Sequence, residues 1–262
     1  MINVSLVHKR LQTASFGRKI YAFETIDSTN SCARVMAGAG APEGTVVIAE
    51  LQTSGRGRMG RSWVANPQEN LTFSVVLRPG MSSLNLLPLL TGIAVADAVR
   101  EAAGVEPDCK WPNDLLLGGR KFCGILLEGS LRDEALEFAV AGIGINVNQI
   151  LFPPDLSDRA TSLRLICGRE FNREELLRTI LHHLEHLYLT GRREDFSSVP
   201  RLWTTRAQMI GKPILVQMRD TRLAGTALRI APDGGLVIAT DSGEQTVYAG
   251  DVTFPSIEQP AP

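Results

Sequence analysis

The chain has 262 residues, 44% of them hydrophobic, which is enough for one large domain or for a main domain with a small companion. Its 27 basic and 28 acidic residues give a formal net charge of −1, which excludes a global attraction to nucleic acid or to anionic membranes. The four cysteines form no C-x-x-C pair, so they indicate neither a zinc site nor a redox dithiol.

The N-terminal segment "MINVSLVHKRLQTASFG" lacks the continuous apolar stretch and the cleavage site of a signal peptide. No apolar run reaches the roughly 20 residues that a membrane helix needs. These features predict a reduced, cytoplasmic protein without a membrane partner.

The first third of the chain alternates between strands and one short helix. Residues 18–24 are predicted to form a strand, followed by a helix that Ser28 or Thr29 caps and that runs to about residue 37. Residues 45–50 and 71–77 have the composition of buried strands. Between them lies "TSGRGRMGRSW" (residues 53–63), in which three arginines alternate with glycines.

The middle of the chain is predicted to contain two long helices and a β-meander. Residues 84–104 have the apolar recurrence of a largely buried helix that ends at Gly104. Residues 109–129 form the meander, with Gly118 and Gly119 in a hairpin turn, and residues 136–148 form a further strand. A helix capped by Asn172 should bury Leu176, Leu177, Ile180, Leu184 and Leu187, and another should cover about residues 195–209.

From Gly211 onward the sequence changes to short strands. The segments "KPILVQM", "LAGTALRIA", "GLVIAT" and "QTVYAGDVTF" predict four or five strands in a small barrel of the SH3-like size. We therefore predict an α+β domain over residues 1–210 and an all-β domain over residues 211–262.

The arginine–glycine loop nearly fits two phosphate-binding signatures. Gly55, Gly57 and Gly60 satisfy G-x-G-x-x-G, and the same stretch is a P-loop with arginine in place of lysine. Both signatures require the loop to open a helix, and Asn66-Pro67 argues against one. Both interpretations are therefore disfavoured.

Three other interpretations of the loop remain: a mobile surface loop, a tether for nucleic acid, and a wrap for a polyanionic small molecule. Repulsion among three arginines within a few residues opposes the first, and a single copy at near-zero net charge opposes the second. Glycines allow backbone amides to approach a ligand, arginines bind phosphates in bidentate fashion, and Trp63 offers a flat face for a base. We therefore favour nucleotide phosphates as the ligand.

A second cluster supplies Lys110, Asn113, Asp114 and Lys121. Taken alone, "WPND" is an ordinary turn, because Pro, Asn and Asp favour turns for local reasons. The order and spacing of "DSTN", "GRGRMGRSW", "KWPND", "RKFCGIL" and "GIGINVN" closely resemble those of the biotin protein ligase family. The resemblance covers about residues 24–148, and the β-rich C-terminal segment resembles the family's SH3-like domain.

The resemblance implies a mixed β-sheet flanked by helices, related to the catalytic core of class II aminoacyl-tRNA synthetases. It also implies an enzyme that joins biotin to the carrier domain of acetyl-CoA carboxylase. Met59 departs from the family, in which this position is often basic, and Cys123 stands where a small residue is common. Only about 20 residues precede the first predicted strand, fewer than a DNA-reading domain needs, so we expect ligase activity without repressor activity and without DNA binding.

The resemblance also assigns roles to individual residues. Those implied to bind biotin are Ser28, Thr29, Asn30, Gln52, Gly55, Arg56, Gly57, Arg58, Lys121, Gly124, Gly142 and Gly144. Those implied to bind ATP or the adenylate are Arg58, Arg61, Trp63, Asn113, Lys121 and Asn146. Mg²⁺ is expected to reach the site on the ATP phosphates, with no metal site of the protein's own.

Catalysis is assigned to Arg58 and Lys121, which stabilise the phosphoryl transition state, and to Asp114, which orients or deprotonates the carrier lysine with Lys110 nearby. The loop is expected to be mobile when empty and to become ordered around biotin and the adenylate.

Several alternatives remain open at this point. His182 and His186 have the spacing of a metal pair, although the polar side of a helix explains them equally well. "GIGIN" is a candidate edge strand for a homodimer, and the sequence does not settle the oligomeric state. A lipoate-type ligase or a non-catalytic nucleic-acid-binding module are the alternative functions.

Overall fold

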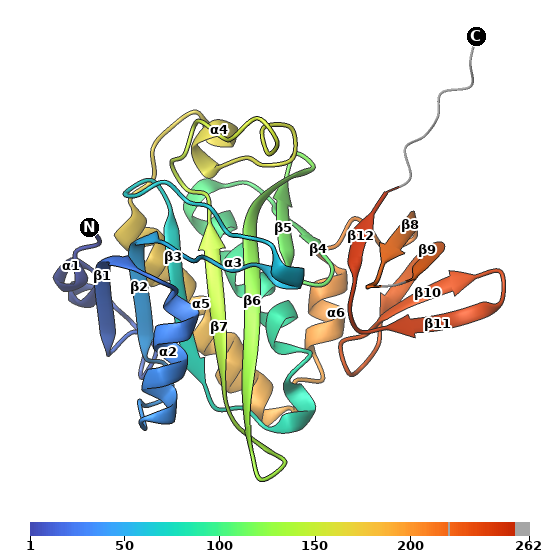
Figure 1. The fold of residues 1–262 in the computed structure, drawn as a ribbon, viewed down its shortest axis with the longest axis horizontal. Coiled ribbons are helices and arrows are strands. Elements are labelled where there is room, and N and C mark those ends of the chain that lie inside the picture. The colour runs from blue at the N-terminus through green and yellow to red at the C-terminus, as the bar shows by residue number, and fades with distance from the viewer. Residues whose placement is uncertain (220, 255–262) are drawn as a thin grey trace.

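The structure is a computed structural model that describes residues 1–219 and 221–254. Its main element is a seven-stranded sheet in the order β1-β2-β3-β7-β6-β5-β4 (Figure 1). Strands β1 and β2 are parallel, and all other neighbours in this sheet are antiparallel, which confirms the predicted mixed sheet. The strands are β1 (Ile20–Ile26), β2 (Val46–Gln52), β3 (Leu71–Leu77), β4 (Asp108–Lys110), β5 (Asp114–Leu117), β6 (Arg120–Arg132) and β7 (Ala135–Ile145).

Helices cover both faces of this sheet (Figure 1). Helix α2 (Thr29–Gly38) begins at Ser28, whose side chain accepts from the backbone N–H of Ser31, and it packs on one face. The longer helices α3 (Leu87–Ala103) and α5 (Arg173–Arg193) cover the other face, where their leucines join the main core. The short helices are α1 (Val4–Lys9), α4 (Leu163–Cys167) and α6 (Val199–Thr204), with 3₁₀ turns at Arg58–Gly60 and Met81–Ser83.

A second, five-stranded antiparallel sheet follows in the order β11-β10-β9-β8-β12. Its strands are β8 (Pro213–Gln217), β9 (Arg222–Ile230), β10 (Leu236–Thr240), β11 (Gly243–Val247) and β12 (Asp251–Thr253). The prediction of a C-terminal β domain is confirmed, whereas the exact boundary at residue 211 stays a prediction. The indole N–H of the buried Trp111 donates to the carbonyl of Gly234 at 3.2 Å, which joins this sheet to the main body.

One predicted helix is wrong, and one alternative that the sequence left open is excluded. The helix expected over residues 195–209 is only α6, because Asp195 and Phe196 have positive φ angles and Pro200 is tolerated only in a first helical turn. "GIGIN" is no edge strand, because β7 is paired on both sides, with β3 and with β6. Leu187 is also only partly buried, whereas the other leucines and the isoleucine predicted on α5 are buried.

One buried ion pair ties α5 to the sheet. Glu50 at the end of β2 accepts from Arg173 at 2.8 Å, and both side chains are largely buried, at 5% and 11% exposure. The backbone N–H groups of Ile2 and Gln68 also donate to this carboxylate. Burial alone would raise the pKa of Glu50, but Arg173 and the two N–H groups hold that pKa below its ordinary value.

Replacing Arg173 with methionine should cost about 3 kcal/mol of unfolding free energy near neutral pH, because it leaves the Glu50 carboxylate buried without its partner. The pKa of Glu50 is lowered in the folded chain, so the pair stabilises above the unfolded pKa, and this stabilisation is lost as pH falls through the folded pKa. Urea unfolding should therefore show a difference from wild type that is full near pH 7 and narrows as pH falls below 4.5, the ordinary pKa of a glutamate carboxyl.

Arg192→Met is the matched control on the same helix. Its pair with Glu43 is also 2.8 Å long, but Arg192 is 46% exposed. A surface pair of this kind is worth about 1 kcal/mol or less. Equal losses in the two variants would contradict the role assigned to the buried pair.

Candidate active site

The site is built on three glycines of the main sheet, Gly124, Gly142 and Gly144, which we call the glycine patch. Gly144 of β7 lies opposite Gly124 of β6, and Gly142 lies opposite Leu126. A Cβ at Gly144 would lie 2.3 Å from Cε2 of Trp63, and one at Gly142 would lie 2.2 Å from Oδ1 of Asn30. Any side chain at these two positions would therefore displace a residue that rests on the sheet.

The arginine–glycine loop crosses this patch (Figure 1). Arg56 and Ser62 form an antiparallel bridge, and the backbone N–H of Trp63 donates to the carbonyl of Gly55 at 3.0 Å. Between them lies a single 3₁₀ turn, in which Met59 has a φ of 55°. The loop opens no α-helix, which removes both the dinucleotide and the P-loop interpretations.

The three loop arginines contact three different parts of the chain. Arg56 pairs with Glu128 of β6 at 3.1 Å, and Arg61 pairs with Asp251 of β12. Arg58 donates to Oδ1 of Asn113 at 3.1 Å and to the carbonyl of Gly250 at 3.5 Å. The loop is therefore held by the main sheet at one end and by the C-terminal sheet at the other.

The "KWPND" turn places Asn113 and Asp114 beside β6. Asn113 donates to the carbonyl of Ile125 at 2.6 Å, and the Asp114 carboxylate lies 2.6 Å from Nζ of Lys121. The β5–β6 register shifts between Leu115 and Leu116, which lets the Lys121 side chain lie over Gly124 although three positions separate them. Lys121 also lies 5.7 Å from the centre of the Trp63 ring, a cation–π contact.

These residues form a charged cluster, which we call the cationic cluster: Lys110, Lys121, Arg58 and Arg61, with Asp114 and Asp251. Burial, followed by the charges of Lys121 and Arg61, lowers the pKa of Lys110, while Asp114 and Asp251 oppose the shift. Burial also lowers the pKa of Arg58. Four basic groups against two acidic ones leave an excess of about two positive charges, so the cluster suits a polyanion.

A polar row lies on the other side of the glycine patch. The backbone N–H of Thr29 donates to Oε1 of Gln52 at 2.7 Å, and the Thr29 hydroxyl lies 3.0 Å from the same oxygen. The hydroxyl of Ser74 on β3 lies 2.8 Å from that of Thr29 and 2.6 Å from Oδ1 of Asn30. Ser28 is used as the N-cap of α2. Three of the residues that the resemblance assigns to biotin, Thr29, Asn30 and Gln52, therefore lie together in the structure, and Ser74 joins them.

Asn146 is less open than the sequence suggested. It is 5% exposed, and its side-chain amide donates to the carbonyl of Thr161 at 3.0 Å. Among the described residues, the two buried side-chain polar atoms without a hydrogen-bond partner are Nε1 of Trp63 and Oγ1 of Thr161. Trp63 lies against Gly144 of β7. The carbonyl of Thr161 accepts from the side chain of Asn146.

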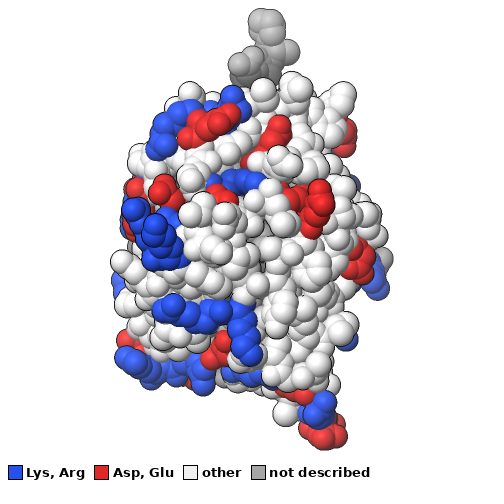
Figure 2. Space-filling view, turned by 90° about the vertical axis from the view of Figure 1, so that its left-hand side faces the viewer, with Lys and Arg blue, Asp and Glu red and all other residues white. Residues whose placement is uncertain are grey.

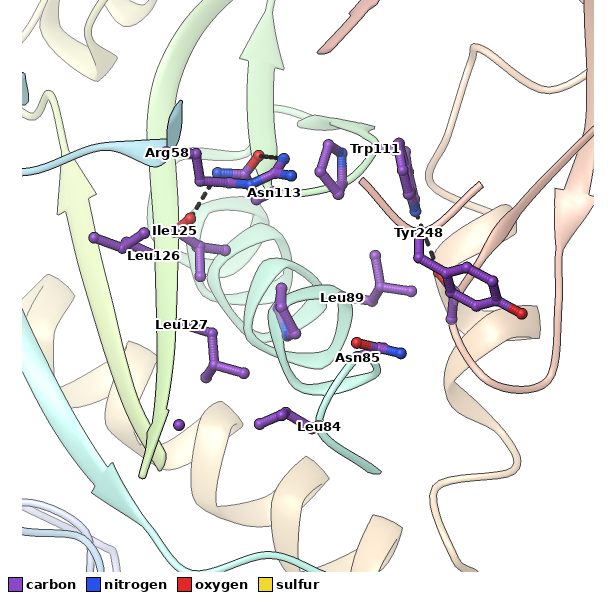
Figure 3. Close-up of a pocket in the computed structure, with 14 residues that line it drawn as sticks. Arg58, Leu84, Asn85, Leu89, Trp111, Asn113, Ile125, Leu126, Leu127 and Tyr248 are labelled. Atoms are coloured by element: carbon purple, nitrogen blue, oxygen red, sulfur yellow. Dashed lines mark hydrogen bonds between the residues drawn. The ribbon is translucent and has the colours of Figure 1, made fainter. Parts of the chain in front are cut away.

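A cavity of about 220 Å³ extends from Arg58 and Asn113 between β6, α3 and the C-terminal sheet (Figure 3). Leu84, Leu89 and Leu127 surround it, and Tyr248 borders it from the C-terminal sheet. Arg58 is the member of the cationic cluster that lines this cavity. Within the described ranges there is no group of three or more His, Cys, Asp or Glu that could hold a metal ion, and no helix is long and apolar enough to cross a membrane.

Comparison with known proteins identifies the family. The Biotin/lipoate A/B protein ligase family matches residues 22–146, and the Biotin protein ligase C terminal domain matches residues 209–254. The biotin–[acetyl-CoA-carboxylase] ligase of Mycobacterium tuberculosis is 32% identical over 259 residues, covering 95% of this chain and 93% of the relative. The chain belongs to the biotin protein ligase family.

Two further relatives agree with this assignment. The bifunctional ligase/repressor BirA of Bacillus subtilis is 35% identical over 246 residues, covering 92% of this chain and 76% of that protein. The biotin protein ligase of Aquifex aeolicus in complex with biotin and ATP has a TM-score of 0.78 at 28% identity, covering 90% of this chain and 98% of that one. The predictions of the family, the fold class and ligase activity are confirmed.

Sequence reasoning missed Ser74, Leu126, Glu128 and Asp251. Gly124, Leu126 and Glu128 alternate along β6, so the period of two would have placed Glu128 on the same face as the predicted glycine. Asp251 has no such signal, because only the packing of the two sheets brings it to Arg61.

Gly144→Ala should displace Trp63 from the ligase's sheet, because the new methyl group would overlap the indole. We expect a red shift of tryptophan fluorescence as the ring moves into water. Gly38→Ala is the control, since a Cβ there meets nothing within 4 Å and should change stability by about 0.5 kcal/mol or less. An unchanged emission spectrum of Gly144→Ala would refute this packing.

Proposed function

We propose that this ligase activates biotin with ATP to biotinyl-5′-AMP and pyrophosphate, and then transfers biotin to a lysine of a carrier domain. The observation that carries the proposal is the cationic cluster, with its excess positive charge, next to a side-chain-free patch and a polar row. The Aquifex aeolicus relative, whose structure contains biotin and ATP, supports the choice of substrates.

The first half-reaction converts the biotin carboxylate, which is a poor acylating agent, into a reactive anhydride with AMP. An oxygen of the biotin carboxylate attacks the α-phosphorus, the bond to the β-phosphate oxygen breaks, and pyrophosphate leaves. Negative charge grows on the phosphoryl oxygens and on the leaving group, so fixed cations lower the barrier. Arg58, Arg61 and Lys121 are the groups proposed for this role.

Biotin is proposed to lie between the polar row and the glycine patch. Its ureido ring needs donors and acceptors, which Ser28, Thr29, Asn30, Gln52 and the backbone of residues 55–58 would supply. Trp63 lies over Gly124 and Gly144, and Asn30 lies over Gly142, so we propose that the bicyclic ring takes its place on the glycine patch as the Trp63 indole moves aside. The carboxylate would then point toward Lys121.

The adenine is proposed to lie toward Trp63, Asn113 and Asn146. The unpartnered Nε1 of Trp63 and Oγ1 of Thr161 support this side, because a buried polar atom without a partner is costly unless a ligand completes it. The side-chain amide of Asn146 is already bonded to Thr161, so we assign it a positioning role rather than a direct contact with adenine.

Mg²⁺ fits the site only as a companion of the nucleotide. The acidic groups of the cationic cluster are Asp114 and Asp251, and each is paired with a basic side chain. Mg²⁺ prefers several waters and phosphate oxygens over a cage of protein ligands. When bound, it would neutralise part of the triphosphate charge, and the residues of the chain would position the substrates and stabilise the remaining charge.

The C-terminal sheet is proposed to hold the phosphate-binding arginines before ATP arrives. Arg61 is paired with Asp251, and Arg58 donates to the carbonyl of Gly250. Phosphate oxygens are stronger partners for guanidinium groups than a neutral carbonyl is. ATP would therefore take Arg58 away from Gly250, and the larger negative charge of the triphosphate would compete with Asp251 for Arg61, so that the loop is drawn over the nucleotide.

The second half-reaction requires an uncharged amine. The lysine nitrogen attacks the carbonyl carbon of the anhydride, the bond from that carbon to the AMP oxygen breaks, and AMP leaves. The amine must first lose a proton, because it is protonated near neutral pH. Asp114 is our candidate to accept it, once Lys121 has moved from Asp114 to the adenylate phosphate.

A lipoate-type ligase is the second candidate, because the matched family includes both biotin and lipoate ligases. The biotin ligases among the relatives favour biotin. Nucleic-acid binding has less support. On the face in Figure 2, basic and acidic side chains occur in small groups of both signs separated by uncharged surface.

The relative from Mycobacterium tuberculosis is named for acetyl-CoA carboxylase, which makes that carrier domain the proposed protein substrate. The absence of repressor activity, the cytoplasmic location, homodimerisation and the ordering of the loop on ligand binding stay predictions.

The function is tested by pyrophosphate release from ATP in the presence of biotin or lipoate, before and after an apo carrier domain is added. We expect release with biotin before the carrier is present, and a loss of about a hundredfold or more in Arg58→Ala and in Lys121→Ala. Release with lipoate alone would favour the second candidate. Oligonucleotide binding without pyrophosphate release would refute both.

Asp114→Asn separates the two half-reactions. In single-turnover assays we expect transfer of biotin from biotinyl-AMP to the carrier to fall about a hundredfold or more, because the base is lost. Adenylate formation should fall by no more than about tenfold, because Lys121 keeps its charge and loses only its resting partner. Equal losses in both steps would contradict the role of Asp114 as a base.

A further inference from the structure

Glu128 contacts two parts of the ligase that lie apart in the sequence, Asn30 in the polar row and Arg56 in the arginine–glycine loop. Its Oε2 accepts from the Asn30 side-chain amide at 2.8 Å and from Arg56 at 3.1 Å. Arg56 also donates to the hydroxyl of Ser31 at 3.2 Å. Asn30 belongs to the polar row and Arg56 to the loop, so one carboxylate holds a residue of each.

Glu128 also fixes which way the Asn30 amide faces. The nitrogen of that amide donates to Glu128 and to the carbonyl of Leu126 at 3.2 Å. Both partners accept only, so rotating the amide by half a turn would put its oxygen against two other oxygens. Oδ1 of Asn30 must therefore face Ser74, at 2.6 Å.

This orientation sets the direction of the hydrogen bonds along the row. The Ser74 hydroxyl has one proton, which Oδ1 of Asn30 takes at 2.6 Å. The Thr29 hydroxyl donates its one proton to Oε1 of Gln52 at 3.0 Å. Two protons serve three oxygen contacts, so the 2.8 Å contact between the Ser74 and Thr29 hydroxyl oxygens is left without one. Lone pairs therefore remain free on these two hydroxyl oxygens.

We propose that Glu128 is a positioning residue for biotin recognition: it aligns the polar row so that acceptors face the ligand's ureido N–H groups, and it anchors the loop through Arg56. This inference rests on the proposed function. It predicts a selective effect on biotin, because Glu128 contacts the polar row and the loop but none of the residues in the cationic cluster.

The test is the KM-against-kcat split of Glu128→Gln in pyrophosphate release. Glutamine keeps the shape but loses the charge and can donate, so the Asn30 amide is no longer fixed. The KM for biotin should rise about tenfold or more, while kcat and the KM for ATP stay within about twofold. A KM for biotin near the wild-type value, or an equal rise in the KM for ATP, would overturn the proposal.

Glu137→Gln is a matched control. Glu137 pairs with Arg132 at 3.0 Å, and both glutamates have side chains that are 23% exposed. Glu137→Gln should leave both KM values unchanged. If it raises the KM for biotin as much as Glu128→Gln does, the effect is a general loss of charge on the sheet and the proposal fails.

If Glu128→Gln folds poorly, a second variant and a readout that needs no turnover still test the proposal. Arg56→Gln removes the anchor but keeps the bond between Asn30 and Glu128, so its KM for biotin should rise less than that of Glu128→Gln. In the ligand-free chain, trypsin should cut after Arg58 and Arg61, which all these variants keep, faster in Glu128→Gln and in Arg56→Gln than in wild type or Glu137→Gln. Equal cleavage rates would refute the anchoring.

The outcomes separate this inference from the proposed function. If the wild type releases no pyrophosphate with biotin, the proposed function fails, and the trypsin rates still decide whether Glu128 anchors the loop. If the wild type is active and the KM for biotin of Glu128→Gln is unchanged, only the inference about Glu128 fails.

Discussion

The site depends on keeping four positive charges close together beside a surface without side chains. Like charges repel, and the ligase limits this repulsion with two carboxylates, Asp114 against Lys121 and Asp251 against Arg61. In the proposed reaction both carboxylates are resting partners that a triphosphate would replace. The glycine patch serves the same end, because it lets Trp63 and Lys121 lie flat on the sheet.

The two ends of the site obey different physical rules. The cationic cluster, the proposed phosphate end, is governed by net charge, and its groups act over several ångströms with little dependence on orientation. The polar row, the proposed ureido end, is governed by the direction of short hydrogen bonds between buried neutral groups, where a single reversed amide changes the pattern. Glu128 and Arg56 lie where these two regimes meet.

Most of the fold was predictable because its signals are local. The N-caps Ser28 and Asn172, the buried strand over residues 71–77 and the glycine at the end of α3 all act within a few residues, and each is found as expected. The expected helix over residues 195–209 failed because its apolar content could not reveal the positive φ angles of Asp195 and Phe196. Short helices such as α4 also lack enough turns to produce a periodic pattern.

The candidate site divides in the same way. The arginines, the glycines and the "KWPND" turn could be named from their spacing, whereas Ser74 and Asp251 belong to the site only because of register and packing.

Trp111 shows what this packing means for how the chain can be divided. Its indole N–H bonds the main body to the turn before β10, while Gly250 and Asp251, at the start of β12, are the partners of two loop arginines. The C-terminal sheet is thus a wall of the proposed nucleotide site, and the main body alone would lack two of the groups that hold the loop.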